Sequence, residues 1–261
     1  MAPVFGRPML RFDTVGSTQD VARDLVRSGT GTPGTVIAAA FQTAGRGRRG
    51  RGWFAPEGAN VCLTAVGAPV RPADAWQVAL VAGLAVAEGV GEVTGGRVRP
   101  LLRFPNDVVV GGAKLAGVLV ETTPAPDGGG IIPLVGIGVN VNVAAFPPDL
   151  EASATSLLRL TGGAAFCDVG AVERAVLGRL GDGWAAWRAE NGGGTMRERW
   201  RAAADPEARR TFVHGGRPIP GCRVLDLRAD GRVLVEMPGG RQAEVSAAAV
   251  LLGENDDDPR A

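Results

Sequence analysis

The sequence holds few of the side chains that most often carry covalent or metal-dependent catalysis. Its 261 residues include no tyrosine, one histidine and three cysteines. Cys62, Cys167 and Cys222 are too scattered for a zinc cluster or a disulfide framework, so we expect a reducing, cytoplasmic location. The one histidine, His214, lies in the C-terminal region, apart from the other polar candidates, which argues against a Ser-His-Asp triad. Walker-A and Rossmann glycine motifs are absent as well.

Strong net charge and long hydrophobic runs are also missing. The formal net charge is +1, so no overall field favours a nucleic acid or an acidic membrane surface as a partner. The longest apolar run, residues 78–87, ends at Glu88 and is too short to cross a bilayer. The first residues contain no apolar segment of the kind found in signal peptides. We therefore expect no DNA and no membrane partner, and a buried helix at the apolar run.

Lysine is nearly absent although basic residues are common. Of 28 basic side chains a single one, Lys114, is lysine. The two residue types differ wherever a compact ammonium is needed in place of a planar guanidinium. A lone lysine in a chain that otherwise uses arginine indicates a position where arginine would not serve, with chance as the alternative.

Apolar periodicity predicts an α/β domain followed by a small β module. Predicted helices span residues 17–29, 75–90, 169–187 and 196–204, and predicted strands span residues 35–41, 61–66, 101–104, 108–110, 115–121 and 134–143. Short strands with Gly-containing turns follow at 222–227, 233–237, 243–245 and 250–252. We therefore predict a catalytic domain of residues 1–210, a β module of residues 211–253 and an acidic, disordered tail of residues 254–261.

A glycine-arginine stretch between two predicted strands is the most informative part of the sequence. From Gln42 to Trp53, glycines alternate with arginines that include Arg46, Arg48 and Arg51. Glycine lets a backbone approach an anion closely, and guanidinium groups bind carboxylates and phosphates through forked donors. The stretch therefore predicts a loop that wraps an anion and closes over it. A solvated basic loop or an RNA-binding segment is the alternative.

A second polar group surrounds a predicted hairpin. Asn106 and Asp107 follow a strand that ends at Pro105, where side chains often leave the sheet edge and meet a ligand. Asp107 is a candidate ligand for Mg²⁺. Lys114 begins the next strand and would face the same region. A simple turn-forming Asn-Asp pair is the alternative interpretation.

Two weaker signals complete the set. The strand at residues 136–142 carries glycines that permit close approach of a ligand or another backbone, and Asn140 on it is a candidate for a phosphate or ribose contact. At the first helix, the side chains of Ser17, Thr18 and Gln19 offer both donors and acceptors, as a ureido ring requires. A packed glycine strand and ordinary helix capping are the respective alternatives.

Taken together and in this order, these stretches closely resemble the biotin protein ligases, over roughly residues 12–145. The strongest element is Gln-x-x-Gly-Arg-Gly-Arg-x-Gly-Arg-x-Trp at residues 42–53, and the second is Pro-Asn-Asp followed by Lys-Leu-Ala-Gly-Val-Leu. Two positions depart from the usual pattern. Arg103-Phe104 replaces Lys-Trp, and Gln19 stands where the family often has asparagine.

The resemblance implies a fold and a set of site residues. The fold would be the α/β biotin/lipoate ligase fold, a mixed sheet with flanking helices akin to the class II tRNA synthetase core, followed by a C-terminal SH3-like β-barrel. The implied catalytic residues are Lys114 and Arg48. The implied biotin site comprises Ser17, Thr18, Gln19, Gln42, Arg46, Gly47, Arg48, Lys114 and Gly117. The implied ATP site comprises Arg48, Arg51, Trp53, Asn106, Asp107, Lys114 and Asn140, with Asp107 as the metal ligand.

The resemblance also implies an activity. The chain would use ATP and Mg²⁺ to activate biotin as biotinyl-5′-AMP. It would then transfer biotin to a lysine of a biotin carboxyl carrier protein or domain of a biotin-dependent carboxylase. About sixteen residues precede Ser17, too few for the DNA-binding domain of some family members, so we expect a monofunctional monomer or homodimer. The rivals are a lipoate or octanoate ligase or transferase of the same fold and an RNA-binding module.

Overall fold

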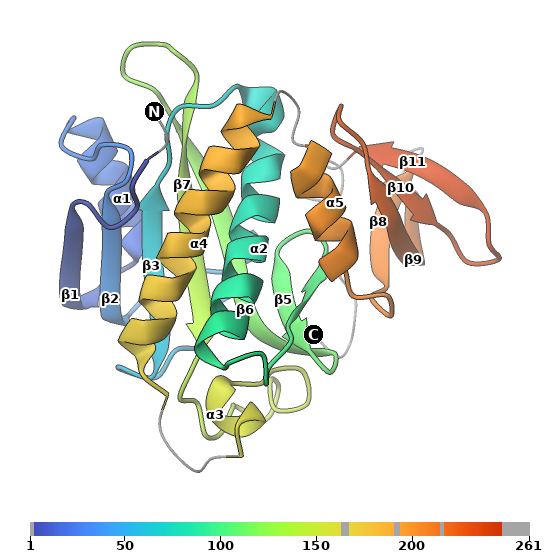
Figure 1. Ribbon diagram of the computed structural model, residues 1–261, viewed down its shortest axis with the longest axis horizontal. Helices are drawn as coiled ribbons and strands as arrows, with labels where there is room; N and C mark the ends of the chain where they lie inside the picture. Colours follow the sequence, from blue (N-terminus) through green and yellow to red (C-terminus); the bar gives the residue numbers. More distant parts are fainter. Residues whose placement is uncertain (1–2, 163–166, 191–193, 215–216, 247–261) are drawn as a thin grey trace.

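The computed structural model describes residues 3–162, 167–190, 194–214 and 217–246. Its centre is a seven-stranded sheet in the order β1-β2-β3-β7-β6-β5-β4 (Figure 1). The strands are β1 (Met9–Val15), β2 (Val36–Gln42), β3 (Asn60–Val66), β4 (Leu101–Arg103), β5 (Asp107–Val110), β6 (Ala113–Pro124) and β7 (Ile131–Asn140). The helices are α1 (Thr18–Arg27), α2 (Ala75–Val93), α3 (Leu157–Leu160), α4 (Val169–Ala189) and α5 (Gly194–Ala203).

The sheet is mixed, as predicted. β1 pairs with β2 in parallel, and the remaining neighbours pair antiparallel. The hairpin between β5 and β6 turns at Gly111 and Gly112, whose φ angles of 58° and 80° suit a two-residue primed turn. The sequence did not predict β1. Four of its seven residues are exposed at the sheet edge, so it lacks the alternation that marks a half-buried strand.

Helices cover both faces of the sheet. On β2, Val36 and Ala38 belong to the core under α2 and α4, whereas Ile37 belongs to a separate core with Ala22 and Val26 of α1. Because successive strand residues point to opposite faces, α1 lies on the face opposite α2 and α4. The latter pair run side by side across the sheet (Figure 1).

α2 is the apolar helix predicted from residues 78–87. By length and composition it could cross a membrane, but most of it is buried inside the fold. Its close approach to α4 depends on Gly89, where an added Cβ would lie 2.9 Å from the Val176 backbone nitrogen. Burial on several sides explains why the helix is apolar around its circumference.

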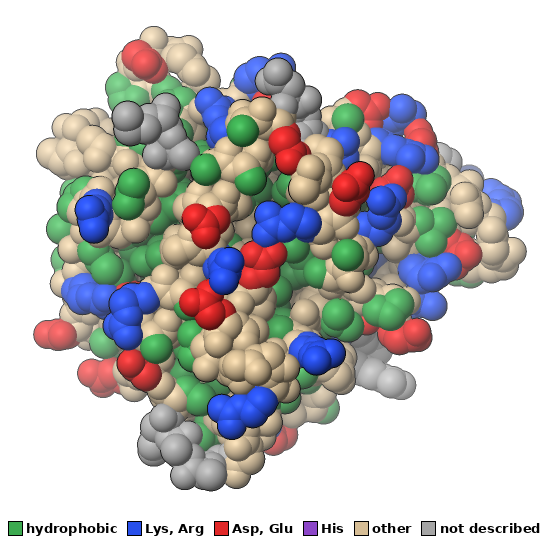
Figure 2. Space-filling model, in the orientation of Figure 1, with side chains coloured by type: hydrophobic (Ala, Val, Ile, Leu, Met, Phe, Trp, Pro, Cys, Tyr) green, Lys and Arg blue, Asp and Glu red, His purple; other side chains and the backbone are tan. Residues whose placement is uncertain are grey.

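The outer surface of the helical layer carries both signs of charge (Figure 2). Arg179 of α4 pairs with Glu92 of α2, and Arg199 of α5 pairs with Glu88. Such exposed pairs add little stability individually, but they keep this face polar. Acidic and basic side chains alternate over α4 and α5, in keeping with the net charge of +1.

A second, antiparallel sheet follows in the order β11-β10-β9-β8. Its strands are β8 (Arg210–His214), β9 (Arg217–Leu227), β10 (Arg232–Glu236) and β11 (Gln242–Ser246). The predicted β module is thus present. It packs through Phe212, which stacks on Phe104 of the main domain with ring centroids 6.4 Å apart. The strand expected at 250–252 and the tail at 254–261 lie outside the described residues.

β8 was missed by the sequence analysis, and it begins one residue before the predicted domain boundary. Cys222, Leu227, Val233 and Val235 of the module join the same buried cluster as the residues under α2. The two units therefore share a continuous apolar core. The division of the chain at residue 210 stays a prediction.

Candidate active site

A cavity of about 1000 Å³ lies on the sheet face that carries α1. It brings together residues from α1, the loop after β2, the β4–β5 turn, β6 and β7, and the start of β8. Every site residue predicted from the sequence lines it: Ser17, Thr18, Gln19, Gln42, Arg46, Gly47, Arg48, Arg51, Trp53, Asn106, Asp107, Lys114, Gly117 and Asn140. The structure thus brings these residues together, and the roles assigned to them stay predictions.

Two facing glycines make the floor of the cavity. Gly117 of β6 and Gly138 of β7 are register partners. A Cβ added at Gly138 would lie 2.6 Å from Cζ2 of Trp53, and one at Gly117 would lie 3.1 Å from Cε of Lys114. The absence of side chains therefore lets the Trp53 ring and the Lys114 stem lie flat on the sheet. The glycine strand was expected to permit close approach of a ligand or another backbone, and in the structure it is approached by the Trp53 and Lys114 side chains.

Hydroxyl and amide groups gather at the N-terminus of α1, which we call the inner end of the cavity. Ser17 caps the helix, and its side chain accepts a hydrogen bond from the Gln19 backbone nitrogen. The Thr18 backbone nitrogen and hydroxyl donate to Oε1 of Gln42 at 2.8 and 3.1 Å, and the same hydroxyl lies 2.8 Å from that of Thr64. Because its oxygen is occupied, Gln42 can offer a ligand only its NH₂ group, which also lies beside the Cys62 thiol.

At this end of the cavity, only the nitrogen of the Gln19 side-chain amide is hydrogen-bonded within the described residues. Its Nε2 donates to the carbonyls of Leu119 at 2.8 Å and Leu134 at 3.3 Å. This fixes which way the amide points, and Oε1 is buried without a partner among the described residues. Gln19 as a residue is 4% exposed, so water does not readily satisfy the oxygen. Gln19 therefore offers an acceptor to an N–H donor in the cavity.

Two further buried polar atoms without a partner among the described residues belong to cavity residues. They are Nε1 of Trp53 and Nε of Arg103. Leaving a buried donor or acceptor unpaired costs about 1–3 kcal/mol. Nε1 of Trp53 lies against the Gly138 backbone and beside the Cys62 thiol, so Oε1 of Gln19 and Nε of Arg103 are the two atoms that a polar ligand in the cavity would complete.

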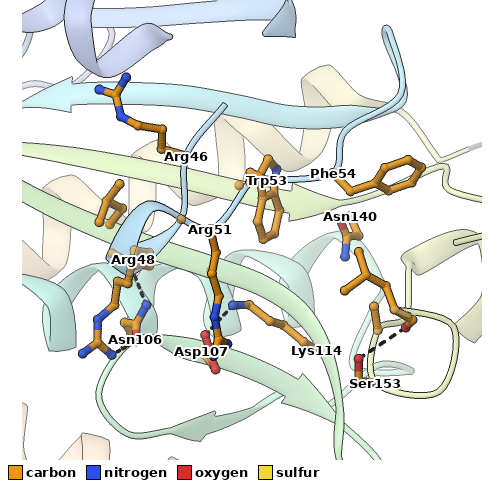
Figure 3. Close-up of a pocket in the computed structure, with 18 of the residues that line it drawn as sticks. Arg46, Arg48, Arg51, Trp53, Phe54, Asn106, Asp107, Lys114, Asn140 and Ser153 are labelled. Carbon is orange, nitrogen blue, oxygen red and sulfur yellow. Dashed lines mark hydrogen bonds and ion pairs between the residues drawn. The ribbon is translucent and has the colours of Figure 1, made fainter. Parts of the chain in front are cut away.

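The glycine-arginine loop is anchored at both ends. Arg46 forms a two-pronged ion pair with Asp20 of α1, at 2.7 and 2.6 Å, and a backbone bridge joins Arg46 to Gly52. The hydrogen bond from Arg46 lowers the pKa of Asp20 below its usual value despite partial burial. Arg46 thus points away from Lys114 (Figure 3). Its guanidinium is held at the cavity rim by the protein itself.

The middle of the same loop reaches across the cavity. Arg48 Nη1 donates to Oδ1 of Asn106 at 2.9 Å, and Asn106 in turn donates to the Val118 carbonyl at 2.8 Å. The Arg51 side chain extends toward Asp107 (Figure 3). The loop arginines and the Pro-Asn-Asp turn, which are far apart in the sequence, therefore meet over the glycine floor.

Lys114 is held by one carboxylate. Its Nζ lies 2.7 Å from Oδ1 of Asp107, and Arg210 Nη2 lies 3.0 Å from Oδ2 of the same group. Burial would raise the pKa of Asp107, but the charges of Lys114 and Arg210 outweigh it and hold that pKa below its usual value. The Lys114 ammonium also lies 5.7 Å from the Trp53 ring centroid, within cation–π range. The side chain is 35% exposed, so a ligand can reach it.

The donor set does not fit a dedicated magnesium site. The described residues hold no group of three or more His, Cys, Asp or Glu side chains placed to bind a metal ion. Asp107, the predicted ligand, has each oxygen engaged by a cationic side chain. Mg²⁺ usually keeps several waters and is bound partly through substrate phosphates. Among the described residues, Asp107 therefore does not belong to a group of three or more side chains that could bind a metal ion.

Asn140 lines the cavity, but its amide is used within the protein. Its Oδ1 accepts from Asn60 at 3.2 Å, and its Nδ2 donates to the Thr155 carbonyl at 3.1 Å. Thr155 and Ser153 in turn bond the backbone of Lys114, at 2.9 and 2.7 Å. Asn140 therefore holds the segment against which the Lys114 backbone is fixed. The contact with a phosphate or ribose stays a prediction.

Several cavity residues were not identified from the sequence. Phe54, Phe146 and Leu150 give the outer end of the cavity an apolar surface, and Arg210 brings a cation from the second sheet. Phe54 directly follows the glycine-arginine motif, a signal that could have included it. Arg210 has no motif around it, because only the packing of β8 on the β4–β5 turn brings it to the cavity.

Comparisons with known proteins agree with this architecture. The model of the biotin/lipoate A/B protein ligase family matches residues 12–142. The biotin–[acetyl-CoA-carboxylase] ligase of Mycobacterium tuberculosis is 35% identical over 250 residues, which cover 92% of this chain and 88% of that protein. The biotin protein ligase of Aquifex aeolicus, solved in complex with biotin and ATP, aligns with a TM-score of 0.75 at 26% identity, over 91% of this chain and 94% of that one.

A third relative extends the comparison to a eukaryote. The biotin protein ligase of Leishmania major, solved in complex with biotinyl-5-AMP, aligns with a TM-score of 0.64 at 25% identity, over 91% of this chain and 98% of that one. The α/β ligase fold and the resemblance to biotin protein ligases predicted from the motifs are thereby confirmed. The chain belongs to the biotin/lipoate A/B protein ligase family.

Proposed function

We propose that this biotin ligase condenses biotin with ATP to biotinyl-5′-AMP and then transfers the biotinyl group to a lysine of a biotin carboxyl carrier protein or domain. The observation that carries the proposal is the meeting of Lys114, Arg48 and the hydroxyl and amide groups of the inner end in one cavity. The relatives named above support it, since one was solved with biotin and ATP and another with biotinyl-5-AMP.

Biotin is expected at the inner end of the cavity. Its ureido ring has one carbonyl acceptor and two N–H donors. The amide group of Gln42 and the hydroxyl of Ser17 offer donors, and Oε1 of Gln19 offers a buried, unpaired acceptor. A lipoyl or octanoyl chain has no ring N–H for Gln19, so the same end would leave that oxygen unpaired. This favours biotin over the other acyl acids used within the family.

The nucleotide is expected above the β4–β5 turn and toward the outer end. The cationic side chains of Arg48 and Arg51 in the loop and Lys114 on β6 line that part of the cavity and suit phosphates. Phe54, Phe146 and Leu150 give the outer end an apolar surface for a heterocyclic base. The carboxylate of biotin and the α-phosphate would then meet over the glycine floor, next to the Lys114 ammonium.

The first chemical step joins two anions, so electrostatics decide its barrier. The biotin carboxylate attacks the α-phosphorus of ATP, the bond to the bridging oxygen breaks, and pyrophosphate leaves. Lys114 and Arg48 offset the charge that accumulates on the α-phosphate and the leaving group. Lys114 is held by Asp107 before substrate arrives, and Asn106 fixes Arg48 once the loop has closed, so little reorganisation is required during the chemical step.

The second step needs no side chain as a covalent nucleophile. The neutral amine of the carrier lysine attacks the acyl carbon of biotinyl-5′-AMP, AMP leaves, and the amine loses a proton to form the amide. Because the mixed anhydride reacts with water, the loop at residues 45–52 is expected to cover it until the carrier docks. The anchors of that loop at Asp20 and Asn106 support this role.

A pyrophosphate-release assay tests the proposal. With biotin, ATP and magnesium we expect one burst of pyrophosphate per enzyme, and with a biotin carrier domain added we expect turnover and a biotinylated carrier. Lipoate in place of biotin is the control and should give neither. Absence of acyl-nucleotide with biotin would refute the function, and equal rates with lipoate would refute the assigned substrate.

A further inference from the structure

Arg210 joins the second sheet to the cavity through a buried polar contact. It is the first residue of β8, where it pairs with Cys222 of β9. Its guanidinium turns back to the main domain, and Nε donates to the Phe104 carbonyl at 3.0 Å while Nη2 lies 3.0 Å from Oδ2 of Asp107. The side chain is 10% exposed. One arginine thus holds both the beginning and the end of the β4–β5 turn.

The contact fixes the orientation of Asp107. Each carboxylate oxygen has its own cation, Oδ2 with Arg210 and Oδ1 with Lys114 at 2.7 Å. Asp107 is 15% exposed, so water competes weakly for either oxygen. Without Arg210, the Asp107 carboxylate could rotate and turn both oxygens toward Lys114 or Arg103. Arg103 also lies close enough to lower the pKa of Asp107. The position of the Lys114 ammonium therefore depends on a residue of the second sheet.

Attachment of the second sheet does not explain why an arginine is needed there. The two units are already held by apolar contacts. Phe212 stacks on Phe104, and Cys222, Leu227, Val233 and Val235 of the second sheet join the apolar core under α2. Burying a guanidinium is unfavourable unless it is paired, and an apolar side chain would pack at least as well for attachment alone.

We propose that Arg210 is a positioning residue for adenylation, which holds Asp107 so that Asp107 directs the Lys114 ammonium into the cavity. The second sheet is then part of the adenylation site and not an appended unit. The inference rests on the proposed function, because it assigns Lys114 to the adenylation step. Arg210 itself is placed to act through Asp107 and not to touch the reacting atoms.

Kinetics of three variants test the inference. We expect Arg210→Met to lower kcat for biotin-dependent pyrophosphate release by about ten- to a hundredfold, as for a misplaced catalytic group, with the KM for biotin nearly unchanged. Arg210→Lys keeps a charge near Asp107 but cannot make both contacts, so an intermediate kcat is expected. Combined with Asp107→Asn, Arg210→Met should cause little further loss, because both substitutions break the same connection.

Arg223→Met is the matched control. Arg223 lies in the same sheet and pairs with Glu236 at 3.1 Å, away from the cavity residues, so this variant should keep the kcat of the starting protein. A normal kcat in Arg210→Met or Arg210→Lys, with only a lower melting temperature, would overturn the inference in favour of simple attachment. Independent, multiplying losses in the double variant would overturn the route through Asp107. Failure of the unsubstituted protein to release pyrophosphate would instead count against the proposed function.

Discussion

The indole of Trp53 lies against the backbone of Gly138, where a Cβ would approach Cζ2 of the ring to 2.6 Å. This contact sets the depth of the cavity, because the ring and the Lys114 stem share the strip of sheet formed by Gly138 and its register partner Gly117. A glycine here is therefore required by a neighbouring side chain and not by its own backbone conformation.

Gly138→Ala should push the Trp53 ring into the cavity and weaken adenylation. Overpacking of this kind costs about 1–3 kcal/mol of stability, and we expect kcat/KM for biotin to fall by about a hundredfold if the ring moves by an ångström. Pyrophosphate release and thermal unfolding measure the two effects. Gly178→Ala is the control, because an added Cβ on this exposed residue of α4 meets nothing within 4 Å. It should stabilise α4 slightly and leave kcat/KM unchanged.

Lys114→Arg should abolish most adenylation although it keeps the charge. The Lys114 stem runs close over Gly117, and its ammonium is confined between Asp107 and the Trp53 ring. A planar guanidinium is longer and needs more room. We expect the rate of pyrophosphate release to fall by about a hundredfold or more. Near-normal release by this variant would show that the lone lysine has no special role.

How much of this site the sequence could predict depends on how local each signal is. The loop arginines, the Pro-Asn-Asp turn and Lys114 stand within short motifs whose chemistry is visible in the residues themselves. The hairpin at Gly111-Gly112 brought Asn106, Asp107 and Lys114 together correctly, because its turn type follows from two adjacent glycines. The predicted helices and buried strands were also confirmed, because their apolar patterns are likewise visible in neighbouring residues.

The parts that the sequence could not give are pairings between distant elements. Arg46 was predicted to contact a ligand, and nothing in the motif indicates that Asp20 of α1 holds it. The contacts of Asn140 could not be predicted either, since its partners Asn60 and Thr155 are brought to it by the sheet register. Arg210 reaches Asp107 only because Phe212 packs on Phe104. Each of these contacts is set by tertiary packing, which no local pattern encodes.

Arg48→Gly should form the adenylate more slowly, because Lys114 alone then offsets the phosphate charge, and should release it. The substitution removes the bond to Asn106 that ties the loop to the β4–β5 turn, so the cover over the mixed anhydride opens more easily. We expect biotinylation of an added lysine-rich bystander protein, measured by blotting. The bystander is needed because the chain itself offers only Lys114. Arg71→Gly, at an exposed arginine that pairs with Asp74, is the control and should label the carrier alone.

Biotin should protect the glycine-arginine loop from hydrogen exchange. In the free protein, residues 45–52 are held partly by the Arg46–Asp20 ion pair, and partly exposed ion pairs of this kind contribute little stability. We expect these amides to exchange rapidly without ligand and slowly with biotin bound. Amides of the buried strand β3 should exchange alike in both states and act as the internal reference. Equal rates for residues 45–52 with and without biotin would contradict closure of the loop.

Acid should remove the stability that Asp107 contributes. The charges of Lys114 and Arg210 outweigh burial and hold the pKa of Asp107 below its ordinary value, which is about 3.9. A lowered folded-state pKa gives stability that is present above the ordinary pKa and is lost as the pH falls through the folded-state pKa. Asp107→Asn resembles the protonated residue. Its deficit in unfolding free energy should therefore be largest at neutral pH and should shrink as the pH falls below the ordinary pKa and through the lower folded-state pKa.

Urea unfolding at a series of pH values measures this deficit. Asp13→Asn, on the exposed edge strand β1, is the control, and its difference from the starting protein should stay within about 0.5 kcal/mol throughout. A deficit for Asp107→Asn that is constant with pH would contradict this assignment, because it would mean that ionisation of Asp107 does not stabilise the folded protein.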